Sequence, residues 1–455
     1  MLRNDQTKMD KTTIGLRISV IEGVFAQIHI NLTAGMFLTS FALYIGLNNV
    51  GLGILSAIPA FFTGFAFFAI YLSKIMQNRR RLCVLFSGLG RGVFLILGIL
   101  LLSNRQVSHE LFFILIIIHN IFMNLSSNAW LSWMSDLVPK EMRGRYFGIR
   151  STILNFIGMA TNIIGARILD IYKIAGSLAQ GLGSLYTGAS VSSTIAAGVL
   201  SLQPEPTMRK ETTNLKKIFL SPLKDANFLN LLKFISFWYL LAGIASPFYL
   251  VHMLTNLSMS YSKIAIYSIL AGISSLIFQM FWGRAIDRLK SKPVLAVNFF
   301  FAAFLPTIWL FATKDYLLPI WIDAFLTGIF WSGINLSLFN ILFSLTEEKE
   351  SKESYFAVFA TISGIFGFLS ATLGGFIAQI LSNVKINILG LNLINYHLMF
   401  VFATLIRLIS LLFLSKVKEK EAYPSMAAVQ LVGDLALRRL VFYKDLILNT
   451  LRFQR

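Results

Sequence analysis

Ionisable side chains lie inside long apolar stretches of this chain, and they are the residues best placed to do chemistry. Asp323 has no Lys or Arg within one helical turn of its own stretch, and His119 lies at a similar depth in another stretch. A carboxylate in lipid must find a cation or carry a proton, and histidine titrates near neutral pH. We therefore consider Asp323, His119 and Glu22 as candidates for binding and releasing a proton.

Two arginines are buried in the same way. Arg91 lies near the middle of the third apolar stretch, and Arg407 lies in the last one. A guanidinium at this depth needs an acidic partner or water, and Glu22 is a candidate partner for Arg91. A purely structural role is the alternative for both arginines.

Twelve apolar stretches must position these residues, and a bilayer span takes roughly 20 apolar residues. The mean hydropathy is +0.70, and only 13% of the residues are charged. We predict spans over residues 18–46, 49–73, 82–102, 110–135, 146–170, 174–202, 227–255, 262–283, 292–313, 316–345, 354–382 and 393–416. The sixth is diluted by glycines, which suit close helix packing in lipid. The predicted fold class is an all-α integral membrane protein.

Basic residues gather in alternate connections between these stretches, for example at Arg79–Arg81 and at Arg143 with Arg145. The positive-inside rule places these connections and both termini in the cytoplasm, and we expect a plasma (inner) membrane. The net charge of +19 therefore reports topology and not a nucleic-acid partner. Cys83 is the single cysteine, so no intrachain disulfide forms, and the first apolar run is too long for a cleavable signal.

An internal repeat divides the chain into two halves. Tyr146-Phe147 and Tyr355-Phe356 stand 209 residues apart, and Gly158 and Gly367 keep the same offset. We expect a cytoplasmic N-terminus (1–17), an N-terminal six-helix half (18–202), a cytoplasmic linker (203–226), a C-terminal six-helix half (227–416) and a cytoplasmic amphipathic tail (417–455). A solvated segment is the alternative for the tail.

The connection after the eighth stretch reads Gly283-Arg-Ala-Ile-Asp287-Arg288. Together with twelve spans, this stretch resembles the signature loop of the major facilitator superfamily, and the resemblance covers about residues 15 to 416. It implies two pseudo-symmetric six-helix halves that move a small solute through a midplane cavity by alternating access. It also implies that Gly283 allows a sharp turn, while Asp287 and Arg288 help to close the cytoplasmic side.

The equivalent stretch of the first half departs from this pattern. Asn78 and Arg79 stand there without the glycine and the aspartate, so the two halves need not latch alike. Asp136, Arg143 and Arg145 follow the fourth stretch in a pattern that is also frequent in the family. We include all five residues among the gating candidates.

In the resembling family the first, fourth, seventh and tenth helices line the cavity, so we searched these spans for polar stripes at ~100° per residue. The predicted cavity residues are Glu22, His29, Thr33, Ser40, Tyr44, His119, Met123, Ser126, Trp130, Tyr249, His252, Asp323, Thr327, Trp331 and Asn335. Stripes of polar and aromatic side chains indicate an organic solute rather than a bare ion. Helix packing or interfacial anchoring is the alternative for each aromatic residue.

Motifs for enzyme chemistry are absent from the sequence. It contains no phosphate-binding loop and no nucleophile elbow, and its five histidines are scattered, so we expect no enzyme activity, cofactor or metal. Our leading hypothesis is a monomeric secondary transporter of a small organic solute, with protons as one candidate coupling ion. The alternative is a non-transporting membrane sensor or scaffold with the same fold, and a membrane enzyme ranks third.

The predicted topology can be tested by cysteine labelling in a chain without Cys83. Cysteines introduced at Asn104 or Lys314 should react with an impermeant thiol reagent added outside the cell, because both positions lie in connections that are poor in basic residues. Cysteines at Arg80 or Lys210 should stay protected. The reverse pattern would overturn the orientation.

Overall fold

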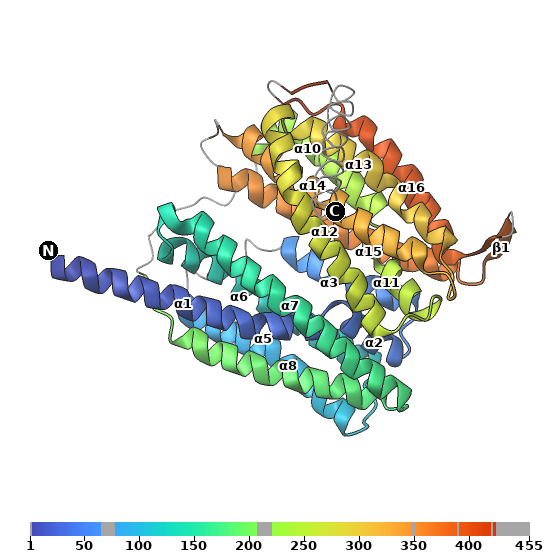
Figure 1. Ribbon diagram of the computed structural model, residues 1–455, viewed down its shortest axis with the longest axis horizontal. Coiled ribbons are helices and arrows are strands. Elements are labelled where there is room, and N and C mark those ends of the chain that lie inside the picture. Colours follow the sequence, from blue (N-terminus) through green and yellow to red (C-terminus); the bar gives the residue numbers. More distant parts are fainter. Residues whose placement is uncertain are drawn as a thin grey trace, which may run out of the picture.

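The computed structural model of this chain describes residues 2–64, 78–206, 221–347, 349, 352–388, 391–419 and 422–424. It is almost entirely helical. Figure 1 shows two helical bundles that diverge from each other on one side and meet on the other. Most of the predicted amphipathic tail and the middle of the predicted linker lie outside the described residues.

The N-terminal half contains α1 (Leu2–Thr33), α2 (Gly35–Tyr44), α3 (Asn49–Gly64), α5 (Arg79–Leu102), α6 (His109–Leu137), η1 (Lys140–Met142), α7 (Arg143–Ile174) and α8 (Leu178–Ser201). The C-terminal half contains η2 (Pro222–Lys224), α10 (Ala226–Phe237), the π-helical η3 (Trp238–Ala242), α11 (Ser246–Thr255), α12 (Tyr261–Leu289), α13 (Ser291–Ile308), η4 (Trp309–Phe311), α14 (Leu318–Thr346), α15 (Lys352–Ile380) and α16 (Asn395–Leu414). An antiparallel hairpin of β1 (Lys385–Ile388) and β2 (Leu391–Ile394) joins α15 to α16, with Lys385 opposite Ile394.

The helices of the structure agree with the expected number of twelve spans. Within the described residues, 10 helices are long and apolar enough to cross a membrane, and α3 and α8 complete the set of twelve. The first span differs from the expectation in its start, because α1 is already helical from Leu2 and residue 18 falls inside it. The β-hairpin before α16 was not expected from the sequence.

Glycines explain why the weakly apolar α8 still packs as a span. A Cβ atom on Gly98 of α5 would lie 2.6 Å from Thr187 Oγ1, and one on Gly183 of α8 would lie 3.0 Å from the Gly98 carbonyl oxygen. The two backbones therefore approach more closely than larger residues allow, as small residues permit in lipid.

The two ends of the molecule differ, and we name them by their residues. The basic end carries Arg79, Arg143 and Arg288, and the hairpin end carries the β1–β2 hairpin and Asn104. The halves touch at the hairpin end: Asn49 Nδ2 donates to the Ala378 carbonyl oxygen at 3.2 Å. Figure 1 shows the bundles parting toward the opposite side, where α1 extends.

Two further contacts hold the hairpin end together. Both carboxylate oxygens of Asp170, on α7, accept hydrogen bonds from the first backbone amides of α12, at Tyr261 (2.7 Å) and Ser262 (2.9 Å). The Tyr396 hydroxyl, on α16, donates to Asn49 Oδ1 at 2.7 Å. An aspartate on one half thus caps a helix of the other half, which stabilises the helix N-terminus.

The first helix of each half is interrupted at equivalent positions. The α1–α2 break falls at Ala34 and Gly35, where Gly35 has φ +55, a conformation that L side chains rarely adopt. The break between η3 and α11 falls at Gly243–Ala245, and Gly243 stands 209 residues after Ala34. The repeat offset read from the sequence therefore relates two broken helices.

Close packing of α3 on α15 predicts how the hairpin end can be opened. A Cβ atom on Gly53 would lie 2.6 Å from the Ala371 carbonyl oxygen and 2.7 Å from Gly375 Cα, so Gly53→Leu should force the helices apart. A cysteine at Ser246, without Cys83, should then react faster with a thiol reagent added at the hairpin end. Gly88→Leu is the matched control, because a Cβ there meets nothing within 4 Å. Equal labelling in both variants would contradict the prediction.

Candidate functional site

Two adjoining cavities lie at the broken helices. The central cavity, of about 390 Å³, lies between the halves and is lined by Asn31, Gly35 and Asn162 on one side. The inner cavity, of about 180 Å³, lies within the C-terminal half. Tyr249 and Tyr267 line both cavities, so the inner one is a side chamber of the central one.

The backbone breaks supply part of the cavity wall. Ala34 and Gly35 line the central cavity from the N-terminal half, and Ser246, just after the second break, lines both cavities. Irregular backbone at membrane depth is tolerated where it faces a cavity, because water or a solute can pair with its free N–H and C=O groups. The breaks therefore mark a candidate binding region.

One acidic residue, Asp323, and one cationic residue, Arg407, line the inner cavity. Asp323 on α14 is 2% exposed, and its Oδ2 accepts a hydrogen bond from the Tyr267 hydroxyl at 2.7 Å. The side chains of Trp309 and Thr327 also approach this carboxylate. Arg407 on α16 attracts it electrostatically, but no direct ion pair joins the two residues in the described part of the chain. Neutral donors thus hold the Asp323 carboxylate.

Arg407 keeps spare hydrogen-bonding capacity. Its Nη1 donates to the Ala302 carbonyl oxygen at 3.1 Å, and its guanidinium carbon lies 5.5 Å from the centre of a Trp238 ring. Its Nε is buried without a hydrogen-bond partner. The chamber can therefore donate to an acceptor group on a solute.

Aromatic rings form the remaining wall. Tyr249 lies 4.9 Å from Trp309 and stacks on Phe400 at 4.5 Å between ring centres. Tyr267 lies 6.1 Å from Trp309, and Trp331 closes the other side. Flat rings in this arrangement favour a solute that itself contains a ring.

The structure brings four of the predicted cavity residues together: Tyr249, Asp323, Thr327 and Trp331 line the inner cavity. Sequence reasoning missed Asn31, Asn162, Tyr267 and Trp309, and it left Arg407 without a partner. Asn162 Nδ2 donates to Asn31 Oδ1 at 3.3 Å, which gives the N-terminal half a polar wall. Two asparagines in apolar stretches were a usable signal, but Tyr267 lies on a helix that the search did not include.

The other predicted cavity residues line neither cavity. The breaks at Gly35 and Gly243 redirect only the residues that follow them, Ser40, Tyr44 and His252. The others lie on unbroken parts of α1, α6 and α14, where the helical period alone does not tell which face meets a neighbouring helix and which meets a cavity. His29 Nδ1 contacts the Ala189 carbonyl oxygen at 3.2 Å, and His119 Nδ1 contacts that of Gly90 at 2.8 Å, so both lie inside the N-terminal half. Three further residues pack inside the N-terminal half: Thr33 donates to the His29 carbonyl oxygen, Met123 lies near Gly90, and Ser126 donates to the Cys83 carbonyl oxygen. On α2, Ser40 is buried and Tyr44 is exposed. In the C-terminal half, His252 lies beside His397, and Asn335 is exposed on α14.

The expected partnership of Glu22 with Arg91 is confirmed. Glu22 Oε1 lies 3.5 Å from Arg91 Nη2, and Glu22 Oε2 lies 3.7 Å from Arg150 Nη2. The Arg150 guanidinium carbon lies 4.5 Å from the centre of the Trp130 ring. Glu22 and Trp130 therefore belong to a charge cluster inside the N-terminal half, away from the two cavities.

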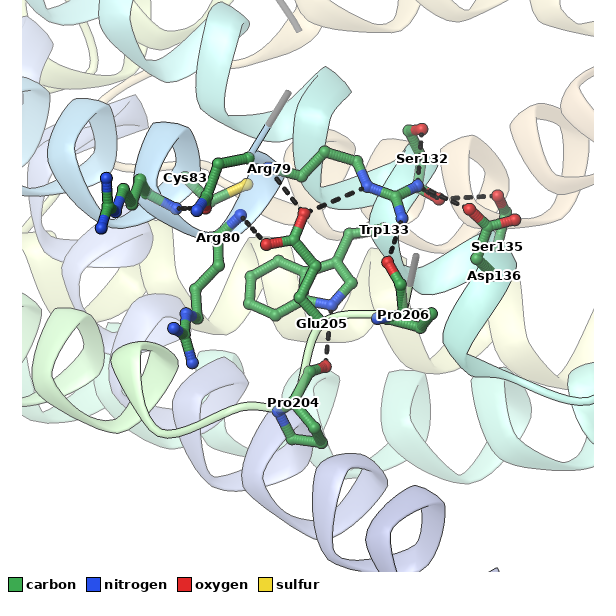
Figure 2. Close-up of polar contacts among 12 residues, drawn as sticks. Arg79, Arg80, Cys83, Ser132, Trp133, Ser135, Asp136, Pro204, Glu205 and Pro206 are labelled. Carbon is green, nitrogen blue, oxygen red and sulfur yellow. Dashed lines mark hydrogen bonds and ion pairs between the residues drawn. The ribbon is translucent and has the colours of Figure 1, made fainter. Parts of the chain in front are cut away.

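At the basic end of the N-terminal half, buried Arg79 organises a second polar cluster (Figure 2). Its Nη1 lies 2.7 Å from Asp136 Oδ2, and its Nε lies 3.6 Å from Glu205 Oε1. The two oxygens of Glu205 accept hydrogen bonds from the backbone amides of Arg79 and Arg80. Asn78 caps the same helix by accepting from the Arg81 amide at 2.8 Å. The acid missing from the first-half signature is thus supplied by Glu205, after α8.

The C-terminal half repeats this arrangement with a different acid. Glu419, after α16, accepts hydrogen bonds from the backbone amides of Ser291 (3.1 Å) and Lys292 (2.6 Å), the first residues of α13. In each half, a glutamate that follows the sixth helix therefore caps the third helix. Sequence reasoning missed both glutamates, because each lies far along the chain from the helix that it caps.

The predicted roles of the second-half signature need correction. Gly283 makes no turn, because α12 continues to Leu289 and the chain turns at Lys290, with φ 70. Asp287 and Arg288 are exposed on the last turns of α12, and it is Glu419, not Asp287, that caps the N-terminus of α13. Arg145 is also exposed, whereas Arg143 donates to the Val138 carbonyl oxygen at 3.2 Å.

Asp225 caps the first helix of the C-terminal half at the same end. Its Oδ1 accepts from the backbone amides of Asn227 (3.0 Å) and Phe228 (3.1 Å), and its Oδ2 lies 2.8 Å from Lys349 Nζ. Partial burial opposes the charged form, but the Lys349 ammonium and the two amides outweigh it and lower the pKa of Asp225. This acid therefore stays charged at neutral pH, which strengthens its hydrogen bonds to the two amides.

No metal centre is found in the part of the chain that the structure describes: no group of three or more His, Cys, Asp or Glu side chains is arranged to hold an ion.

These features define a helical membrane protein built from two repeated halves, with two cavities where the first helix of each half breaks. The sequence matches the Major Facilitator Superfamily twice, over residues 23–244 and 232–449. The chain therefore belongs to this family. The two matches begin 209 residues apart, which is the repeat offset noted above.

Solved structures share the fold. The nucleoside transporter NupG, in a mutant form, matches with a TM-score of 0.66 at 13% identity, covering 88% of this chain and 100% of that one. A bacterial homologue of the human lysosomal transporter Spinster, inward-facing and occupied, matches with a TM-score of 0.61 at 13% identity, covering 92% and 98%. No curated protein sequence matches this chain. At these identities the structural likeness shows the fold alone.

The paired glutamate caps predict a stability effect. Glu419→Ala removes two charge-assisted hydrogen bonds from the start of α13 and should cost about 1–2 kcal/mol. The purified protein should unfold at a lower temperature, with faster amide exchange at Ser291 and Lys292. Asp287→Ala is the matched control, because it removes an exposed acid from the same end. Equal effects of the two substitutions would refute the capping role.

Proposed function

We propose that this chain is a secondary transporter, which moves a small organic solute by alternating access through the central cavity. The observation that carries the proposal is the pair of adjoining cavities at the two broken helices, with walls from both halves. Membership of the family supports it, because the fold is that of transporters. Drive would come from a solute or proton gradient, since the sequence contains no phosphate-binding loop.

We further propose that the basic end faces the cytoplasm. The positive-inside rule supports this orientation, because Arg79–Arg81, Arg143 and Arg145 all lie at that end. The contacts of Asn49 and Asp170 then close the outer side. The halves diverge toward the other side (Figure 1), which supports an inward-facing conformation in this orientation.

The side chains that line the inner cavity limit the class of solute that can bind there. The rings of Tyr249, Trp309 and Trp331 favour a flat ring, while Asp323 accepts and Arg407 donates hydrogen bonds. A ring that carries hydroxyl and carbonyl groups meets these requirements. Nucleosides, the solutes named for NupG, combine both features and are the first to test.

Asp323 is our candidate for proton coupling. Its carboxylate is buried in the chamber and held by the Tyr267 hydroxyl, without a direct cation. Opening and closing of the halves changes the water access of such a group, and with it the cost of its charge. Proton binding at Asp323 would then follow the transport cycle. His119 and Glu22 are weaker candidates, because both lie inside the N-terminal half.

The alternative function is a non-transporting sensor or scaffold. The missing aspartate of the first-half signature favoured that alternative, but Glu205 and Asn78 now account for the capping of α5 without it. Counterflow of a labelled solute in proteoliposomes separates the two functions. A solute that binds the purified protein and shows no counterflow would support the sensor.

Coupling at Asp323 predicts a specific loss. Asp323→Asn keeps the size of the side chain and removes its titration, so proton-driven accumulation should fall to the level of empty vesicles. Exchange of solute across the membrane should continue, because exchange needs no net proton movement. Both rates are measured in proteoliposomes with an imposed pH gradient.

The control is Asp315→Asn, an exposed acid at the hairpin end, which should keep both activities. Normal accumulation by Asp323→Asn would exclude Asp323 as the coupling residue.

A further inference from the structure

The charge cluster inside the N-terminal half is not balanced. It contains two guanidinium groups, Arg91 and Arg150, and one carboxylate, Glu22, which is 4% exposed. A buried surplus charge is costly, because the low dielectric removes the stabilisation that water provides. Among the residues that the structure describes, the cluster therefore carries a net positive charge.

Hydrogen-bond donors in the cluster are also unsatisfied. Nε and Nη1 of Arg91 are buried and have no hydrogen-bond acceptor. The whole residue is only 5% exposed. The indole nitrogen of Trp130, which lies against Arg150, is likewise buried and unpaired. Unpaired buried donors are rare in native proteins and call for an explanation. A phosphate or carboxylate group accepts several hydrogen bonds and carries negative charge, so it would satisfy both these donors and the excess positive charge of the cluster.

The surrounding residues hold Arg150 in place. Its Nε donates to the Ser19 carbonyl oxygen at 3.4 Å, and its guanidinium lies over the Trp130 ring. Gly23 leaves the necessary space, since a Cβ there would lie 2.6 Å from Arg150 Nη2. The guanidinium is therefore positioned by contacts other than its loose, 3.7 Å ion pair with Glu22.

The cluster is separate from the two cavities. Along α1, Glu22 lies twelve residues before the break at Ala34, which places the cluster about 18 Å toward the basic end. The Arg150 side chain is 14% exposed, so the cluster reaches the surface of the bundle at this residue. Figure 1 shows α6 and α7 on the side of the N-terminal half that is turned toward the other half.

We propose that Arg91, Arg150 and Trp130 form a second binding site, which takes an oxyanion group such as a phosphate or carboxylate. The bound oxyanion supplies the missing negative charge and competes with Glu22 for the two guanidinium groups. This site is independent of the transport function proposed above, because its occupancy is measured on the purified protein without any flux.

The experiment uses the full chain in nanodiscs of phosphatidylcholine, with inorganic phosphate as the probe. Phosphate should raise the unfolding temperature in a concentration-dependent manner beyond chloride at the same ionic strength. Arg150→Gln should abolish this shift and is expected to fold, since it removes the surplus charge. Arg145→Gln, an exposed arginine on the same helix, should keep the shift. Glu22→Gln should bind phosphate several-fold more tightly, because the competing carboxylate is gone.

A second arm replaces part of the lipid by phosphatidylglycerol. If the shift appears with this lipid alone and is lost in Arg150→Gln, the oxyanion site takes a lipid headgroup. If phosphate acts in phosphatidylcholine, the site takes a soluble oxyanion. A shift that persists in Arg150→Gln, or no shift with either probe, would overturn the proposal.

Discussion

Backbone hydrogen bonding inside a bilayer is the constraint on which the rest of this structure depends. A helix that breaks in lipid leaves N–H and C=O groups unpaired, so breaks survive only where they face a cavity or other protein groups. The chain breaks its first helix at Ala34–Gly35 and again, 209 residues later, at Gly243–Ala245. Both breaks lie at the central cavity, and its position therefore follows from the repeat.

The two halves share their framework but not their polar interiors. A glutamate caps the third helix in each half, Glu205 on α5 and Glu419 on α13. Inside the bundles the charges differ: the N-terminal half carries a surplus guanidinium beside Glu22, whereas the C-terminal half holds one acid and one arginine beside an aromatic chamber. The caps are therefore common to both repeats, whereas the polar interiors of the two halves have diverged.

The sequence predicted the framework well, because hydropathy, basic loops and repeat offset are local or periodic signals. The number of spans, the pairing of Glu22 with Arg91 and the family were all readable in this way. The site was only partly readable. A stripe along a straight helix cannot anticipate a turn at Gly35, and Tyr267 becomes a partner of Asp323 only when α12 packs on α14. Glu205 and Glu419 were invisible for the same reason, since long-range packing brings them to their helices.

The distribution of contacts fits a molecule whose halves move as two bodies. At the basic end the strongest polar contacts stay within one half, as in the pairing of Arg79 with Asp136 and of Asp225 with Lys349. At the hairpin end they join the halves, through Asp170 and the first amides of α12. Contacts within a half survive a rigid rotation, whereas contacts between halves must break. The Asp170 cap and the close crossing of α3 with α15 are therefore the interactions that a change of access has to overcome, and the caps at the basic end keep each bundle intact while it moves.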